Sequence, residues 1–143
     1  MSLIVDNNVA VEFFCGSTPD LQPLKQAVLD AICCLYYGGQ LQREYFRSEK
    51  VRRMVKQFDQ AGRAKKVSDT AVDKKTDEVK PKCVSDDPHV IALALVSGAR
   101  LLCSRDQDLH TDFKNPELIN SPRGHVYQNA SHEHLIRLCC QGG

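Results

Sequence analysis

The amino-acid sequence predicts a single α/β domain with parallel strands at its centre. Two short apolar runs, residues 2–5 and 101–103, are each followed closely by an aspartate, Asp6 or Asp106. Continuous apolar runs of this length are typical of strands that are buried on both faces of a parallel sheet. The segments between the two runs carry apolar residues three and four positions apart, which indicates helices. With 143 residues the chain is long enough for one hydrophobic core and too short for two.

The first elements are a strand and two helices. Residues 2–5 form the strand, and Asn7 or Asn8 can accept a hydrogen bond at the start of the helix that follows it. Residues 21–37 then repeat apolar side chains at helical spacing as far as Gly38. We therefore expect one core-facing helix there, which ends at the glycine.

The middle of the chain is also expected to be helical. Residues 41–58 return to helical spacing, and Glu44 lies at the edge of their buried stripe. Residues 59–82 lose the apolar repeat and are rich in lysine and aspartate. This composition predicts a charged surface helix with mobile ends.

A buried helix opens the second half of the domain. Proline favours the first position of a helix, so Pro88 makes Asp87 the expected N-cap. Residues 90–96 are apolar all round, and we expect the helix to be buried until Gly98 ends it. Beyond it we expect two strands and a closing helix, at residues 101–103, 125–127 and 131–139.

The near-neutral charge of the chain hides an uneven distribution. The formal net charge is +1, yet residues 43–66 contain nine basic residues and three acids. A polyanion such as RNA can dock on a surface of this kind. The alternative is a solvated helical face whose lysines and arginines serve solubility.

The cysteine pattern and the lack of a long apolar segment predict a cytoplasmic protein. The seven cysteines are odd in number, and two pairs of them are adjacent in sequence, which suits neither a disulfide framework nor a zinc site. Reduced, mostly buried thiols are the expectation. The sequence starts with neither a secretory signal nor a membrane span, so we expect a cytoplasmic location.

Acidic side chains are expected to meet at the carboxyl end of the sheet. Asp6 and Asp106 each follow a strand, and open parallel sheets bind ligands beyond the carboxyl ends of their strands. Glu44 and Asp87 can reach the same crevice from their own helices. Two carboxylates about 4 to 5 Å apart repel by roughly 3 to 4 kcal/mol at an effective dielectric constant of about 20. A hard divalent cation such as Mg²⁺ or Mn²⁺ offsets this repulsion, so the acids predict a metal site.

Each acid also has an ordinary structural interpretation. Aspartates commonly cap helices or form turns, and glutamates pair with arginines. Two carboxylates that share a proton would also relieve their repulsion without a metal. These interpretations apply singly to Asp6, Glu44, Asp87, Asp106 and Asp108. It is the joint occurrence of the acids that favours a catalytic cluster.

Four short motifs, in their order along the chain, resemble those of the PIN-domain ribonuclease family. They are Leu-Ile-Val-Asp-Asn-Asn-Val at residues 3–9, Leu-Gln-Arg-Glu-Tyr at 41–45, Asp-Pro-His-Val-Ile-Ala-Leu-Ala at 87–94 and Leu-Cys-Ser-Arg-Asp-Gln-Asp-Leu at 102–109. None of the motifs is specific alone, but together they span nearly the whole chain. In each of the first three motifs one acid occupies the matching place, and in the fourth a hydroxyl residue precedes the acid by two.

The resemblance implies a fold and a chemistry. The fold would be a PIN-like three-layer α/β/α domain with a small central parallel sheet, over residues 1–143. The catalytic acids would be Asp6, Glu44, Asp87 and Asp106, which would hold one or two Mg²⁺ or Mn²⁺ ions with Asp108, supported by Asn8 and Ser104. RNA would be hydrolysed by a water that the cation activates, which leaves a 5′-phosphate and a 3′-hydroxyl. The expected RNA contacts are Arg43, Arg47, Arg52 and Arg105.

The resemblance also implies partners, and it leaves alternatives open. Many relatives are homodimers, and many are toxins that a small antitoxin protein silences. The charged residues 59–82 differ from the hydrophobic helix pair that such toxins usually carry there, which weakens the expectation of an antitoxin. Alternatively, the fold serves as a catalytically silent module for RNA binding or assembly. A phosphoacceptor receiver domain would need paired acids after its first strand, where Asp6 has asparagines beside it.

Overall fold

A computed structural model describes residues 2–16 and 18–141 of the chain and shows an α/β fold with a five-stranded parallel sheet. The strands are β1 (Ser2–Val5), β2 (Cys34–Tyr37), β3 (Ala64–Lys66), β4 (Leu101–Cys103) and β5 (His125–Tyr127). Their order in the sheet is β3-β2-β1-β4-β5. The predicted parallel sheet is therefore confirmed, with β1 at its centre.

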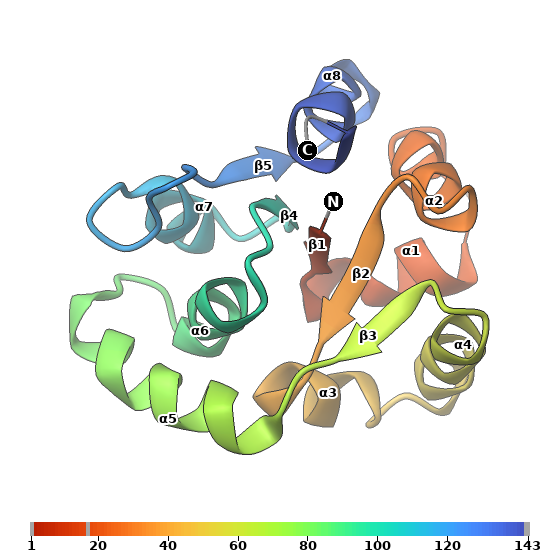
Figure 1. Ribbon diagram of the computed structural model, residues 1–143. Helices are drawn as coiled ribbons and strands as arrows, with labels where there is room; N and C mark the ends of the chain where they lie inside the picture. The colour runs from red at the N-terminus through yellow and green to blue at the C-terminus, as the bar shows by residue number, and fades with distance from the viewer. Residues whose placement is uncertain (1, 17, 142–143) are drawn as a thin grey trace.

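Helices cover both faces of the sheet, which gives the three layers that the sequence predicted. The helices are α1 (Ala10–Cys15), α2 (Gln22–Leu29), α3 (Gly39–Tyr45), α4 (Glu49–Gln60), α5 (Asp69–Val79), α6 (Pro88–Ser97), α7 (Gln107–Lys114) and α8 (His134–Ile136). Figure 1 shows α1, α2 and α4 on one side of the sheet and α5, α6 and α7 on the other. Shorter helical turns are η1 (Asn7–Val9), η2 (Lys80–Lys82), η3 (Ala130–His132) and η4 (Arg137–Gln141). No helix within the described ranges is long and apolar enough to cross a membrane.

The two central strands form the most deeply buried part of the core. Leu3, Ile4 and Val5 pair in register with Leu101, Leu102 and Cys103, and all of these side chains are buried. The backbone N–H of Asp6 donates to the carbonyl of Cys103 at 2.9 Å, so the pairing continues one residue past β1. This bond fixes the position of Asp6 at the end of the strand.

The predicted single helix over residues 21–37 is wrong. The helix α2 ends at Leu29, and Ala31 with a φ of 62° turns the chain out of the helical path. Residues 34–37 instead form β2, which lies between β1 and β3. The apolar residues of this short strand also match helical spacing, so periodicity did not separate the two structures.

Two further elements differ from the prediction in the middle of the chain. The expected helix over residues 41–58 is divided into α3 and α4, because the Ser48 side chain accepts the backbone N–H of Val51 and starts a new helix. The charged segment, residues 59–82, contains the edge strand β3 before the helix α5. A single side chain of β3, that of Ala64, is buried, so the strand carries no alternating pattern.

The second half of the chain follows the prediction closely. Pro88 begins α6, and Gly98 ends it in the left-handed conformation with a φ of 83°. The strands β4 and β5 have the predicted bounds. The closing helix is shorter than expected, because α8 covers three residues between η3 and η4.

The cysteine prediction holds only in part. Cys15, Cys34, Cys83 and Cys103 are free thiols, and burial raises the pKa of the Cys103 thiol to about 12. Cys33, however, is disulfide-bonded, so the expectation that every cysteine is reduced is wrong at this position.

Candidate active site

The candidate site lies where the direction of chain winding changes. From β1 the sheet grows through β2 and β3 on one side and through β4 and β5 on the other. At such a switch point the loops after the two central strands leave the sheet in opposite directions, and a crevice opens between them. Asp6 follows β1 and Ser104 follows β4, so the sequence delivers both residues to this crevice.

Asp6 is buried and firmly held. Its side chain is 3% exposed, Oδ2 accepts the Ser104 hydroxyl at 2.7 Å, and Oδ1 accepts the Asn7 backbone N–H at 2.8 Å. Burial raises the pKa of the Asp6 carboxyl, while these two hydrogen bonds act in the opposite direction. Each carboxylate oxygen can accept a further bond, so both oxygens keep a free lone pair.

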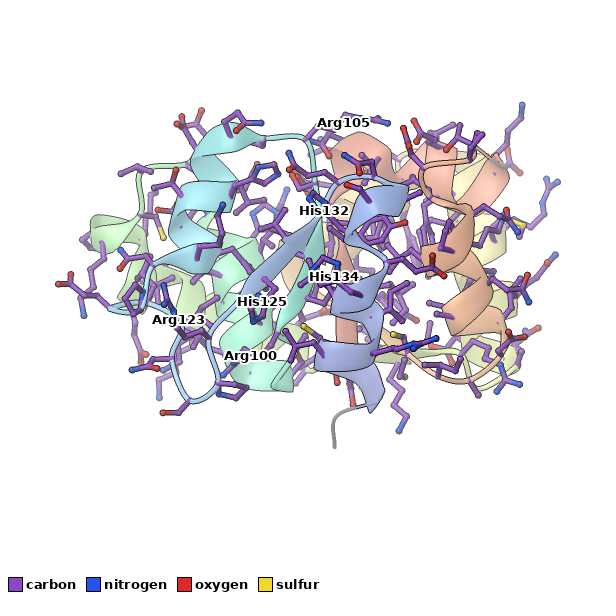
Figure 2. All side chains as sticks on the ribbon, turned by 90° about the horizontal axis from the view of Figure 1, so that it is seen from above. Arg100, Arg105, Arg123, His125, His132 and His134 are labelled. Atoms are coloured by element: carbon purple, nitrogen blue, oxygen red, sulfur yellow. The ribbon has the colours of Figure 1, made fainter. Side chains whose placement is uncertain are left out.

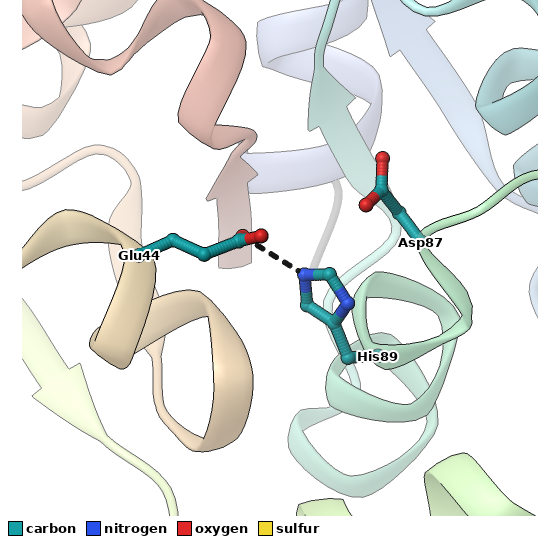
Figure 3. Close-up of side chains that lie close together, drawn as sticks. All are labelled: Glu44, Asp87 and His89. Atoms are coloured by element: carbon teal, nitrogen blue, oxygen red, sulfur yellow. Dashed lines mark hydrogen bonds and ion pairs between the residues drawn. The ribbon is translucent and has the colours of Figure 1, made fainter.

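Glu44, Asp87 and His89 converge from two helices. One ligand atom of each residue lies within 4.8 Å of the others. Figure 3 shows Glu44 reaching from α3 toward His89 and Asp87 at the start of α6, with the Glu44 Oε1 and His89 Nε2 atoms 3.0 Å apart. Asp87 stands at the N-cap position of α6, but within the described residues its side chain makes no capping hydrogen bond. Its carboxylate is therefore available for another function.

The electrostatics of Asp87 connect all four predicted acids. Burial is the largest cause of its raised pKa, and the negative charge of Asp6 is the next. Glu44 and Asp106 raise the pKa of Asp87 further, and His89 lowers it. The ligand atoms that lie within 4.8 Å of one another belong to Glu44, Asp87 and His89, and Asp6 and Asp106 lie outside that group.

Ser104 links Asp6 to Asp106. The Ser104 side chain is 1% exposed, and its Oγ accepts the backbone N–H of Asp106 at 3.1 Å while it donates to Asp6. Asp106 Oδ1 caps α7 by accepting the backbone N–H groups of Asp108 and Leu109. Asp106 is thus the N-cap of α7 and not a turn former alone, and its second carboxylate oxygen takes no part in the cap.

The supporting residues are placed less uniformly. The Asn8 amide donates to Ser104 Oγ at 3.5 Å, and Asn8 Oδ1 accepts the Arg105 backbone N–H at the same distance. Both distances are at the long limit of a hydrogen bond. Asp108, a predicted metal ligand, is exposed in the first turn of α7 and is not among the charges that act on Asp6 or Asp87.

The predicted RNA contacts fall into two groups. Arg43 is paired with Asp73 at 2.8 Å, and Arg105 is paired with Glu12 at 2.6 Å. Arg47 and Arg52 are exposed, and neither side chain makes a hydrogen bond or an ion pair within residues 2–16 and 18–141. Figure 2 shows Arg105 at the opposite end of the molecule from Arg100 and Arg123, which precede β4 and β5. Arg105 thus lies on the side of the crevice.

Sequence reasoning missed two residues beside the acids. His89 is 6% exposed and is the only imidazole in the converged group of the described chain, and its position two residues after Asp87 was the available signal. Tyr45 is fully buried, and its hydroxyl donates to the carbonyl of Val5 next to Asp6. Burial and then the charge of Asp6 raise the pKa of Tyr45 well above its ordinary value. Tyr45 therefore stays neutral and ties α3 to the end of β1.

A third missed residue, Asp112, holds the loop that precedes Asp87. The Asp112 side chain on α7 is 1% exposed, and its two oxygens accept the backbone N–H groups of Val84 and Ser85 at 3.0 and 2.9 Å. Ser85 Oγ in turn accepts the backbone N–H of Asp87 at 3.3 Å. The contacts pass from α7 to Asp87 in two steps, and nothing in the sequence pattern of Asp112 indicated them.

The donor set of the site suits a hard divalent cation. Carboxylate oxygens are the ligands that Mg²⁺ prefers, and Mn²⁺ accepts carboxylates together with an imidazole. Comparisons of the chain with protein-family models, curated proteins and solved structures found no match. The chemistry of the site therefore rests on its own geometry.

Proposed function

We propose that the chain is a metal-dependent ribonuclease of the PIN type. The observation that supports it is the placement of acidic side chains from four places in the sequence: Glu44 of α3 and Asp87 at the start of α6 converge with His89, and Ser104 joins Asp6 to Asp106 at the ends of β1 and β4. Asp6 is buried and the other three acids are partly buried, and gathering such carboxylates costs stability unless a cation or a proton offsets their charge. A fold that places such carboxylates near one another despite this cost indicates that they serve a function.

Each residue of the site has a definable part in this chemistry. Asp6, Glu44, Asp87 and Asp106 would hold Mg²⁺ or Mn²⁺, and the bound cation would activate water and stabilise charge on the scissile phosphate. Ser104 orients both the Asp6 carboxylate and the backbone of Asp106. The imidazole of His89 orients Glu44. These contacts fix the carboxylates before substrate binds, which is what efficient catalysis requires.

The resemblance extends the proposal to the setting in which the enzyme acts. Cytoplasmic RNA is the proposed substrate, because the basic residues around α4 can contact a phosphate backbone. A homodimer and an antitoxin-like protein partner belong to the same proposal, and both rest on the resemblance alone.

Asp6→Asn and Asp106→Asn test the proposed reaction. We expect each variant to lose Mn²⁺-dependent cleavage of single-stranded RNA and to bind Mn²⁺ more weakly, because each substitution removes a carboxylate. Cleavage is measured on labelled RNA, and Mn²⁺ binding by calorimetry. Glu117→Gln, at an exposed carboxylate on another part of the surface, is the matched control and should behave as the parent does. Unchanged cleavage by both aspartate variants would remove the mechanism.

One observation favours the alternative of a catalytically silent RNA-binding module. The hydrogen bond that Glu44 accepts from the His89 imidazole already gives one carboxylate a partner without a metal. A silent module would bind RNA but neither bind Mn²⁺ nor cleave RNA. The experiment above separates the two functions, because a nuclease must show both of these activities.

A further inference from the structure

A cavity that His89 helps to line opens next to the acid cluster. It has a volume of about 340 Å³ and lies between α3, α5 and the start of α6. His89 lines this cavity and also contacts Glu44 in the acid cluster. Gln40, one helical turn before Glu44 on α3, and Asp86, next to Asp87, line it as well. A ligand in the cavity could therefore contact His89, whose imidazole also contacts Glu44 of the acid cluster.

The helix α5 supplies the opposite wall. Asp73, Thr76 and Asp77 of α5 line the cavity together with Lys80, the C-cap of the helix, and their spacing of three and four places them on one face. Asp73 is paired with Arg43, and the Thr76 hydroxyl donates to the carbonyl of Val72. These two side chains are therefore already engaged.

Three charged groups of the cavity remain unused. Asp77, Lys80 and Asp86 are exposed to the cavity mouth, and in the described part of the chain none of their side chains makes a hydrogen bond or an ion pair. Asp77 and Lys80 are three residues apart, so a carboxylate and an ammonium group belong to the same wall of the cavity. Together they offer strong acceptors next to a strong donor.

The charge of the wall determines which part of an RNA can enter. Three carboxylates face two cationic side chains, Arg43 and Lys80, so the cavity repels a phosphate group. A neutral base with hydrogen-bond donors is the suitable ligand. The volume is within the range of cavities that hold small molecules, and base recognition in RNA uses such polar contacts to the base edges.

We propose that this cavity binds a guanine base of the RNA substrate, which makes the nuclease selective for the nucleotide beside the cleaved bond. Guanine presents two adjacent donors, N1–H and the N2 amino group, which a carboxylate such as Asp77 accepts together. Its O6 is an acceptor beside them, which suits Lys80. Adenine, cytosine and uracil each lack this pair of adjacent donors on the Watson–Crick edge. The inference rests on the proposed ribonuclease function only for its link to cleavage.

Binding without cleavage tests the cavity directly. The probes are two labelled single-stranded RNAs of adenosine and cytidine that contain either one guanosine or one inosine, which lacks the N2 amino group. Fluorescence anisotropy in EDTA measures their affinities for the parent protein. We expect the guanosine RNA to bind about tenfold more tightly, as a good bidentate contact allows. Asp77→Asn should remove this difference, and the exposed Glu117→Gln should retain it.

The outcomes separate the cavity from the nuclease. Equal affinity of the parent for both RNAs would overturn the guanine site even if Mn²⁺-dependent cleavage were observed. A guanosine preference that Asp77→Asn abolishes would support the site even if no RNA were cleaved. Free guanosine 5′-monophosphate is added as a competitor. If it bound as tightly as the RNA, the ligand would be a free nucleotide and the assignment to RNA would be wrong.

Discussion

At the scale of single residues, the candidate site contains a side chain, Asp6, that lowers the stability of the fold. Asp6 follows β1 as a buried carboxylate that accepts hydrogen bonds from Ser104 and Asn7. A buried charge without a cation lowers the stability of a fold, and active sites commonly carry such a cost. The substitution of Asp6 by asparagine should therefore stabilise the metal-free protein, because the asparagine N–H can donate to the Ser104 hydroxyl oxygen while its own oxygen keeps the bond to Asn7.

Asp6→Asn should raise the metal-free free energy of unfolding at pH 8 by on the order of 1 kcal/mol. The folded-state pKa of Asp6 is raised, so its neutral form is favoured in the folded protein. The protonated Asp6 carboxyl contributes to the stability of the folded protein. This contribution is fully present below the pKa of an unfolded aspartate and is lost as pH rises through the folded-state pKa. The gain in the variant should thus shrink toward about pH 4. Urea unfolding in EDTA across this range measures it, and a gain that did not change with pH would contradict the assignment.

At the scale of elements, the candidate site depends on helices that touch it only indirectly. α7 contributes to the site only its cap, Asp106, yet Asp112 in its second turn holds the backbone of Val84 and Ser85. Asp87 follows this loop directly. α7 therefore positions an acid on a different element, α6.

Asp112→Asn should loosen this connection. An asparagine keeps one acceptor oxygen, so one of two backbone N–H groups loses its partner, which costs about 1 to 3 kcal/mol for a buried group. We expect the free energy of unfolding to fall by about that amount and Mn²⁺ to bind more weakly because Asp87 is held less firmly. Thr111→Ala, at an exposed position of the same helix, is the control. If Mn²⁺ affinity were unchanged while stability fell, Asp112 would stabilise the fold without positioning Asp87.

The elements also show where sequence reasoning succeeds. β1 and β4 are buried on both faces, so their apolar runs identified them without further information. β2 could be read as helix because Leu35 continues the spacing of α2, and its pairing with β1 and β3 decides the structure. β3 exposes Lys65 and Lys66 at the sheet edge, as edge strands often do. No local pattern could therefore have revealed it.

At the scale of the whole molecule, topology explains why the acids could be predicted better than their partners. Asp6 and Asp106 follow strands that are neighbours in the sheet, so a parallel sheet alone brings them together. The contact of His89 with Glu44 depends on how α3 and α6 pack. The position of the Arg105 guanidinium depends on its exposed ion pair with Glu12. Such contacts are set by three-dimensional packing, which residue spacing does not encode.

The uneven charge of the whole molecule predicts where RNA binds. Residues 43–66 contain nine basic residues and three acids, although the whole chain has a net charge of +1. Arg47 and Arg52 are exposed there without partners among the described residues. Arg47→Glu with Arg52→Glu should weaken RNA binding and reduce its salt dependence, because each lost phosphate contact lowers the slope of log affinity against log salt by about 0.7 for single strands. Anisotropy of a labelled RNA at several salt concentrations measures both effects.

The matched control reverses two other exposed arginines, Arg123 and Arg137, and changes the net charge by the same amount. A general effect of net charge would weaken RNA binding equally in both double variants, whereas a docking surface around α4 would respond only to Arg47 and Arg52. If the salt slope of the Arg47 and Arg52 variant equalled that of the parent, the basic residues would be a solvated face and RNA would contact another part of the molecule.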